Sequence, residues 1–220
     1  EQGPRLENER KTIGVVTGVL GIRWYDCTVT GMEAHAGPTP MALRKDALQV
    51  AAKLMQEVVA CATRHPPHGR GTVGMVNVFP NSRNVIPGRV KFSIDLRNAS
   101  DALCDAMDAD IRAVAAKLSA DTGLPITIEQ VSAYPAQPFH ADMIGAVQRA
   151  ADQLGYSNMP AVSGAGHDAV YMARLAPAGM IFIPCKDGIS HNEIEDAKPE
   201  HITAGCNVLL HAMLERAGVA

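Results

Sequence analysis

The segment from Ser163 to Ala169 reads Ser-Gly-Ala-Gly-His-Asp-Ala and leads into a pattern that favours a helix. Glycines in such a segment leave backbone amides free to face a phosphate or a carboxylate. A plain turn into a helix, with His167 and Asp168 as a capping pair, explains the same residues without a ligand. The segment matches neither glycine-rich fingerprint of nucleotide-binding proteins, so the sequence disfavours nucleotide binding.

His191 lies in the loop from Gly188 to Glu193, which follows an apolar segment, Met180 to Ile183, that we expect to form a strand. Loops beyond strand ends are where α/β sheets gather ligands, and a neutral imidazole is a common metal ligand. A complete metal site needs about three or four ligands. Other histidines fall in turns or on helix faces without ligand spacing, and we interpret them as structural or solvated: His65, His68, His140, His201 and His211.

Three further places carry polar residues that could bind a substrate. His35 stands at a strand end before a Gly-Pro turn, and Asn84 lies in a loop between two expected strands. Asp95 and Arg97 share the polar face of an alternating strand. Each has an ordinary structural interpretation, as a turn residue or as a surface ion pair, when it is considered alone.

The middle of the chain predicts a complete small domain that would carry these residues. Between Ile22 and Val131 the expected order is strand, helix, strand, strand, helix, strand, which is typical of a ferredoxin-like unit. Thr39 is a plausible N-cap for the first helix, with Pro40 at its first position. The expected strands are 22–30, 72–79, 90–97 and 126–131, and the expected helices are 40–64 and the segment between Ser100 and Gly123.

The remainder of the chain alternates helices and strands in an α/β pattern. A helix over 140–154, a glycine-rich loop, a short helix, a strand over 180–183 and a helix over 199–216 offer too few strands for a sheet of their own. The extended segment before Leu20 can supply one more. We therefore expect residues 1–20 and 134–220 to belong to one α/β domain, into which residues 21–133 are inserted.

Composition sets the class of protein. The chain has 220 residues, 47% of them hydrophobic and 20% charged, with a formal net charge of −3. It lacks a basic patch with aromatics and any apolar run near the roughly 20 residues of a membrane span, which argues against nucleic-acid and membrane partners. Its five scattered cysteines fit neither a disulfide framework nor a structural zinc site, and indicate a cytoplasmic setting.

Taken together, the motifs resemble those of the N-carbamoyl-L-amino-acid amidohydrolases, which act in hydantoin and ureide degradation, and of their relatives the allantoate amidohydrolases and β-ureidopropionases. These enzymes belong to the dinuclear-metal aminoacylase and peptidase superfamily. The resemblance covers almost the whole chain and rests on several spaced motifs in the same order: Glu1-Gln2-Gly3-Pro4, Ala34-His35-Ala36-Gly37-Pro38, Asn84-Val85-Ile86-Pro87-Gly88, Asp95-Leu96-Arg97, Ser163 to Ala169 and Gly188 to Asn192.

The resemblance implies an α/β metallohydrolase domain that binds two divalent ions, with an inserted ferredoxin-like (βαββαβ) lid that also forms a homodimer. It implies that His191 ligates metal and that Gln2 contacts substrate. It further implies that His35 polarises the scissile carbonyl, while Asn84 and Arg97 hold the substrate. Hydrolysis of a ureido or amide C–N bond needs an activated water and a stabilised oxyanion, and a planar guanidinium suits a substrate carboxylate.

One departure from the family is large. The other metal ligands and the general-base Glu of the family precede the Glu-Gln-Gly-Pro motif, and the chain starts at Glu1 without an initiator Met. We therefore expect these residues to be the C-terminal portion of such an enzyme, inactive alone and unable to hold the metals. Zn, Mn, Co and Ni all suit mixed His and carboxylate sites.

Two rival functions remain open at this point. Allantoate amidohydrolase or β-ureidopropionase activity would use the same motifs on a different small ureido or amide substrate with a carboxylate. A non-catalytic ferredoxin-like dimerisation or binding module would explain the missing ligands, but it would not explain why His35, Asn84, Arg97, His167 and His191 occur together in family-like motifs.

Overall fold

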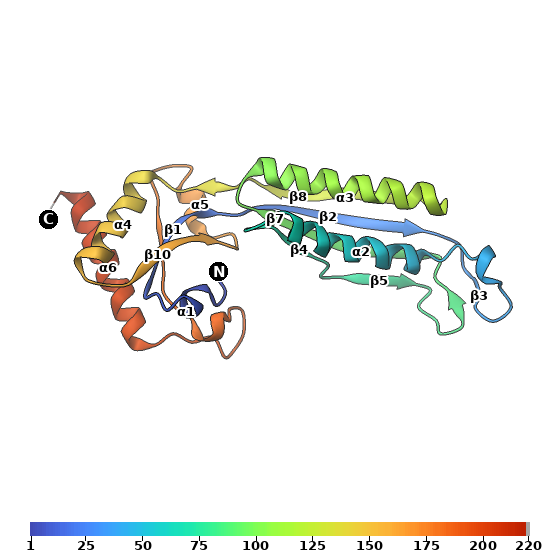
Figure 1. The fold of residues 1–220 in the computed structure, drawn as a ribbon, viewed down its shortest axis with the longest axis horizontal. Helices are drawn as coiled ribbons and strands as arrows, with labels where there is room; N and C mark the ends of the chain where they lie inside the picture. The colour runs from blue at the N-terminus through green and yellow to red at the C-terminus, as the bar shows by residue number, and fades with distance from the viewer. Residues whose placement is uncertain (219–220) are drawn as a thin grey trace. The chain divides into compact units, whose positions relative to one another are not determined.

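The computed structural model describes residues 1–218 and divides into two compact units. The first unit contains Glu1–Leu20 and Ala136–Ala220, and the second contains Gly21–Pro135. Both mix helices with strands, as Figure 1 shows, which confirms the expected mixed α/β class in its coarse form. Within the described residues, no helix combines the length and the apolar character that crossing a membrane requires.

The first unit is built on a small four-stranded sheet. Strand β1 (Ile13–Val19) pairs in parallel with β10 (Asn158–Ser163) and antiparallel with β11 (Met180–Phe182) and the short β9 (Gln137–Pro138). Ile13 and Val15 pack against the long helices α4 (Ala141–Gln153) and α6 (Pro199–Ala217). Val16 and Val19 belong to the core cluster that contains Leu6 of α1 (Arg5–Asn8) and borders α5 (Asp168–Met172).

Strand β10 is absent from the sequence-based expectation, which has only a glycine-rich loop between α4 and α5. The segment contains Pro160, and a proline lacks the amide that a central strand must donate. The structure places β10 at the edge of the sheet, where, among the described strands, it pairs with β1 alone and Pro160 lies opposite Val15. An edge strand tolerates proline, so the strand forms despite its weak sequence signal.

The second unit has a five-stranded antiparallel sheet and two long helices. Its main path runs β4 (Arg70–Thr72), β7 (Arg89–Asn98), β2 (Gly21–Thr30), β8 (Ile126–Tyr134), with β5 (Val76–Phe79) also on β7. Helices α2 (Ala47–Arg64) and α3 (Asp101–Thr122) run along the strands in Figure 1. Alternate residues of β7 form the core beneath these helices, in the predicted pattern: Val90, Phe92, Ile94 and Leu96.

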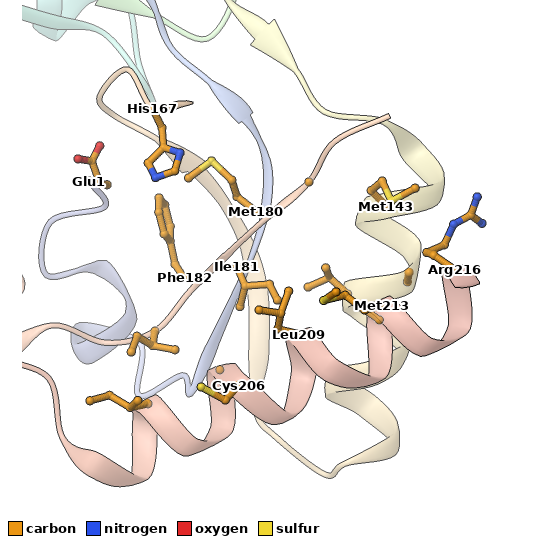
Figure 2. A pocket seen from close by; sticks show the side chains of 17 residues that line it. Glu1, Met143, His167, Met180, Ile181, Phe182, Cys206, Leu209, Met213 and Arg216 are labelled. Atoms are coloured by element: carbon orange, nitrogen blue, oxygen red, sulfur yellow. The ribbon is translucent and has the colours of Figure 1, made fainter. Parts of the chain in front are cut away.

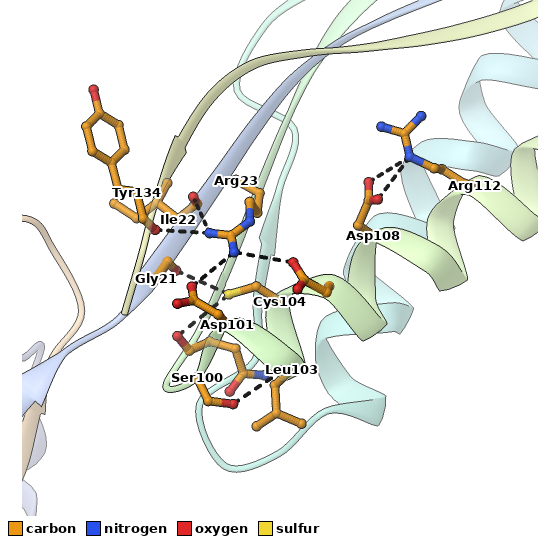
Figure 3. Close-up of polar contacts among 12 residues, drawn as sticks. Gly21, Ile22, Arg23, Ser100, Asp101, Leu103, Cys104, Asp108, Arg112 and Tyr134 are labelled. Carbon is orange, nitrogen blue, oxygen red and sulfur yellow. Dashed lines mark hydrogen bonds and ion pairs between the residues drawn. The ribbon is translucent and has the colours of Figure 1, made fainter. Parts of the chain in front are cut away.

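Polar contacts hold the start of α3 against the sheet, as Figure 3 shows. Ser100 caps the helix as expected, because its hydroxyl accepts from the Leu103 amide at 3.3 Å. The nearly buried guanidinium of Arg23 donates to the carboxylates of Asp101 at 3.0 Å and Asp105 at 3.3 Å. The helix ends at Gly123, which has a φ of +69° and is the predicted stop.

The expected start of the first helix is wrong. Thr39 does not cap a helix at Pro40; its hydroxyl donates to the His35 carbonyl at 2.7 Å. A short 3-10 turn, η1 (Met41–Leu43), precedes α2, whose N-cap is Asp46. The Arg44 side chain binds the carbonyls of Ala36 and Thr39, and these contacts hold the segment out of a helix.

The strand expected over 72–79 is also different, because it forms as two pieces, β4 and β5. Ser93 of β7 separates them, since its hydroxyl accepts from the amides of Gly74 and Met75. The expectation of a buried strand is wrong as well: Val76 and Phe79 are 47% and 39% exposed. Within residues 1–218, both pieces pair with β7 and with no other strand, at the edge of the sheet.

Candidate functional site

In the first unit, Gln2 is fixed beside the end of β11. Its side-chain amide donates to the Ile183 carbonyl and lies 3.7 Å from the Cys185 sulfur. Within the described residues, Oε1 of Gln2 and Oε2 of the neighbouring Glu1 are buried without a hydrogen-bond partner. Buried acceptors are normally paired, so these two oxygens mark a place where a donor or a cation would be favourable.

The loop that carries His191 packs against the turn that follows Gln2. Gly188, at the end of the 3-10 turn η2 (Lys186–Gly188), has a φ of +64°, and a Cβ there would lie 2.0 Å from the Pro4 nitrogen. His191 is exposed, has a φ of +55°, and donates its amide to the Glu195 carboxylate at 3.0 Å. The fold thus brings the segments of Gln2 and His191 together, with the imidazole open to solvent.

The glycine-rich loop joins the same neighbourhood by a backbone contact, because the Gly164 amide donates to the Glu1 carbonyl at 2.8 Å. His167 takes the capping role: its Nδ1 accepts from the Ala169 amide at 3.1 Å at the start of α5. The structure supports the capping interpretation of His167. Because α5 has only five residues, its helix dipole is weak.

A cavity of about 590 Å³ lies between β11, α4 and α6 in the first unit (Figure 2). Its lining is mostly apolar, including Met143, Leu209 and Met213. Figure 2 shows Glu1 and His167 beside Phe182, with Arg216 at the opposite end. The lining suits an apolar group rather than a charged one. No sequence motif pointed to this cavity, because its residues come from five separate stretches of the chain.

In the second unit, His35 and Asn84 lie side by side. His35 lies on β3 (Ala34–His35), which pairs with β6 (Val85–Ile86) so that His35 faces Val85, and Asn84 directly precedes β6. The Ala36 amide donates to the Asn84 carbonyl at 2.8 Å, and Nδ1 of His35 accepts from the Gly37 amide at 3.0 Å. Both side chains are exposed. This leaves Nε2 as the ring atom of His35 able to reach a ligand.

Arg97 lies on β7 in a different part of the second unit. Its guanidinium binds Asp95 in a forked arrangement, with Nη2 2.7 Å and Nε 3.0 Å from the carboxylate oxygens. The side chains of Arg97 and Asp95 are 24% and 25% exposed. The ion pair holds the guanidinium on the open face of the sheet, opposite the face that α2 and α3 cover.

The structure does not bring Arg97 to His35 and Asn84. The last residue of β2, Thr30, pairs with the first residue of β7, Arg89. Figure 1 shows β3 beyond this end of β2, so the ladder of β3 and β6 lies near Arg89. Arg97 is eight residues along β7, and at about 3.4 Å per residue this separates the two places by about 27 Å. One small substrate does not reach both within one copy of the chain.

The structure also assembles a group that sequence reasoning missed. Ligand atoms of Cys61, His65 and Asp110 all lie within 4.8 Å of one another. The signal available in the sequence was the Cys-x-x-x-His spacing near the end of a helix, which puts both side chains on one face. Asp110 comes from another helix, and no pattern in the sequence links it to the other two.

Residues 1–215 of the 220-residue chain match the family model "Peptidase family M20/M25/M40". An N-carbamoyl-L-amino-acid amidohydrolase of Rhizobium meliloti is 45% identical over 219 residues, which are 100% of this chain and 53% of that protein. An allantoate amidohydrolase of Bacillus subtilis is 34% identical over 209 residues, 95% of this chain and 51% of that protein.

Among solved structures, a hydantoinase/carbamoylase family amidase from Burkholderia multivorans superposes with a TM-score of 0.95 at 56% identity. The match covers 99% of this chain and 53% of that one. The chain spans about half the length of the relatives it matches. The resemblance inferred from the motifs is confirmed, and the chain belongs to peptidase family M20/M25/M40.

Proposed function

We propose that this chain provides part of a metal-dependent amidohydrolase that hydrolyses the carbamoyl C–N bond of N-carbamoyl-L-amino acids. The main support is its 45% identity, over its full length, to the Rhizobium meliloti enzyme of that name. The placement of Gln2, Gly164 and the His191 loop around one neighbourhood is consistent with a binding site in the first unit.

In this proposal the first unit, with expected bounds 1–20 and 134–220, is part of the catalytic domain. The second unit, expected over 21–133, is an inserted ferredoxin-like lid. In its main sheet the strand order is β4, β7, β2, β8, which are the second, third, first and fourth strands of the expected unit. Neighbouring strands are antiparallel, and α2 and α3 both cover one face of the sheet. This arrangement is typical of a split βαβ fold.

Each predicted substrate residue has a role that fits its surroundings. Arg97 binds the substrate carboxylate through paired N–H donors, with Asp95 fixing the orientation of the guanidinium. His35 donates a hydrogen bond from Nε2 to the oxygen that becomes negative as the C–N bond is attacked. Asn84, fixed beside His35, binds the substrate, and Gln2 does so from the first unit.

The proposed cofactor is a pair of divalent ions, Zn or Mn, with Co and Ni also suited, and His191 as the ligand that this chain supplies. The described residues do not fit such a pair by themselves. In the described part of the chain, neither His191 nor Glu1 belongs to a group of three close His, Cys, Asp or Glu ligand atoms. The remaining ligands would have to come from outside these residues.

The proposed partner is a second copy of the protein, joined through the lid. The separation of about 27 Å between the His35 ladder and Arg97 supports this, because a partner copy can bring His35 and Asn84 to a substrate held by Arg97. We also propose a cytoplasmic location, since all five cysteines are free. A nucleic-acid or membrane partner has no support in the charge pattern.

Allantoate is the second candidate substrate. The Bacillus subtilis relative named for that activity is 34% identical over 95% of this chain. Both substrates present a ureido group next to a carboxylate, so Arg97 and His35 would serve either one. A non-catalytic dimerisation module is disfavoured, because family membership extends across both units.

A chimera tests the proposal: residues 1–220 replace the matching 53% of the Rhizobium meliloti enzyme. Ammonia release is measured with added Mn or Zn against N-carbamoyl-L-amino acids and allantoate, and amino-acid release from N-acetyl-amino acids is followed in parallel. Turnover of the carbamoyl substrates, abolished in the His191→Ala chimera, is the expected result. A folded, metal-loaded chimera that hydrolyses only allantoate or N-acetyl substrates would overturn the assignment.

A further inference from the structure

A sulfur, a nitrogen and an oxygen ligand meet between the two helices of the second unit. Cys61 and His65 are one turn apart at the end of α2, and Asp110 faces them from α3. His65 Nε2 lies 3.0 Å from Asp110 Oδ2. Cys61 is fully buried, whereas the His65 and Asp110 side chains are 17% and 44% exposed. The group therefore has a buried side and a side open to an ion from solvent.

The backbone around His65 holds this arrangement in place. The side-chain amide of the buried Asn98 donates to the His65 backbone carbonyl at 3.3 Å. The backbone amide of Gly69 donates to the same carbonyl at 2.9 Å. The loop closes so tightly that a Cβ on Gly69 would lie 2.4 Å from the Ala62 carbonyl oxygen. Cys61 and Asp110 stand on long packed helices. Ligands on rigid elements lose little freedom when they bind an ion.

The chemistry of the three donors selects the ion. Thiolate and imidazole favour borderline ions such as Zn²⁺ and Co²⁺, and Mg²⁺ or Ca²⁺ prefer oxygen ligands. Bond lengths of about 2.0–2.3 Å place the ligand atoms of a tetrahedral zinc about 3.3–3.6 Å apart. In the structure the three ligand atoms lie within 4.8 Å of one another, and small side-chain rotations would bring them to the tetrahedral distances. Three protein ligands and one open position are a common zinc arrangement.

We propose that Cys61, His65 and Asp110 form a binding site for one Zn²⁺-like ion, which cross-links α2 to α3. The site is independent of the proposed hydrolysis. Binding displaces the thiol proton of Cys61, which goes to solvent, and replaces the His65–Asp110 hydrogen bond with two metal–ligand bonds. The thiolate and the carboxylate together neutralise the divalent charge, which suits a partly buried position.

The pKa of Cys61 bears on the strength of the site. Burial, together with the Asp110 carboxylate and Glu57, raises it to about 11, and Arg64 acts in the opposite direction. Binding must remove this proton, so the raised pKa opposes metal binding.

The test titrates the 220-residue chain with Co²⁺ and then Zn²⁺. Co²⁺ is expected to bind at one equivalent with a near-ultraviolet thiolate-to-metal absorption band, and Zn²⁺ to displace it. At 100 times its dissociation constant, Zn²⁺ shifts the folding equilibrium about 100-fold, or roughly 5–10 °C in Tm. Cys61→Ser should abolish the band. His65→Gln and the near-isosteric Asp110→Asn, at partly exposed positions, should each weaken binding at least tenfold without unfolding the chain.

Matched controls are Cys206→Ser and His211→Gln, an exposed thiol and an exposed imidazole on α6. Both controls should leave the band and the Tm shift unchanged. Absence of a thiolate band at pH 8, or a band that survives Cys61→Ser and disappears in Cys206→Ser, overturns the site. If Asp110→Asn kept full Zn²⁺ affinity, Asp110 would not be a ligand. That result would also contradict the proposal, because no ligand from α3 would then link it to α2.

Discussion

His35 and Arg97 belong to the same unit, but the ladder that carries His35 leaves the sheet beside Arg89, about 27 Å along β7 from Arg97. Both are assigned to one small substrate in the proposed reaction. Rigid strand pairing along the whole length of β2 and β7 leaves no local rearrangement that could join them. If both residues act on one substrate, as proposed, the active site would be shared between two copies, and mixing variants tests this.

Mixing inactive variants should restore activity if the site is shared. In the chimera, His35→Ala and Arg97→Ala are each expected to lose most activity, about 10²–10³-fold for the loss of an oxyanion donor at His35. After the two variants are unfolded together and reassembled, half of the dimers are mixed, and each has one intact site. Activity should return to about one quarter of the unmutated level. No recovery, with mixed dimers demonstrated by mass spectrometry, would place both residues in one copy.

Arg97→Ala should act mainly on substrate binding. Loss of paired donors to the carboxylate is expected to raise KM by about 10–100-fold with a smaller change in kcat. Arg97→Lys should recover only part of this, because an ammonium lacks the planar fork. Steady-state kinetics with a carboxylate substrate and its amide analogue measure the effect. An unchanged KM for the carboxylate substrate would contradict the role.

His191→Ala in the chimera should reduce bound metal as well as turnover. His35→Ala serves as the comparison, because that side chain is assigned to the substrate and its loss should leave metal content unchanged. Metal is measured by inductively coupled plasma mass spectrometry after gel filtration. If His191→Ala retains all its metal, or if His35→Ala loses metal, the two roles have been assigned wrongly.

Gly188→Ala should disturb the neighbourhood of Gln2. The added Cβ would lie 2.0 Å from the Pro4 nitrogen, at a backbone φ of +64° that alanine adopts poorly. The neighbour is backbone and has little room to move, so we expect a loss of about 2–4 kcal/mol in unfolding free energy. Gly166→Ala is the control, because nothing lies within 4 Å of its Cβ position. Urea denaturation of both variants makes the comparison.

Stability should fall in alkaline solution through the buried thiols. Burial raises the pKa of Cys27 from 9.0 to about 12 and is the largest cause of the rise of Cys61 to about 11. The folded state therefore retains protons that the unfolded chain releases above about pH 9. The stabilisation is complete below pH 9 and decreases as pH rises toward 11–12, by at most about 1.4 kcal/mol per pH unit for each thiol.

Thermal unfolding of the metal-free chain between pH 8 and 10.5 checks this. Cys27→Ala should lower stability at pH 8 because it leaves a cavity, yet its Tm should fall less steeply with pH than that of the unmutated chain. Cys206→Ala, at an exposed position, should keep the original slope. Equal slopes for all three chains would show that Cys27 does not titrate as inferred.

Local patterns in the sequence determined much of the fold. The alternation from Val90 to Leu96 predicted β7, and the Ser100 cap with the Gly123 stop predicted α3. The motifs predicted a resemblance to the N-carbamoyl-L-amino-acid amidohydrolases, which the family match confirms. These signals depend on neighbouring residues along the chain, which sequence periodicity records directly.

Tertiary contacts decided the rest. Side-chain bonds from Arg44 keep residues before Asp46 out of α2, and an edge position lets β10 form around Pro160. The approach of Asp110 to Cys61, and the distance between His35 and Arg97, depend on how α3 packs on α2 and how far the strands run. Such relationships join residues far apart in the chain, so no local pattern in the sequence could specify them.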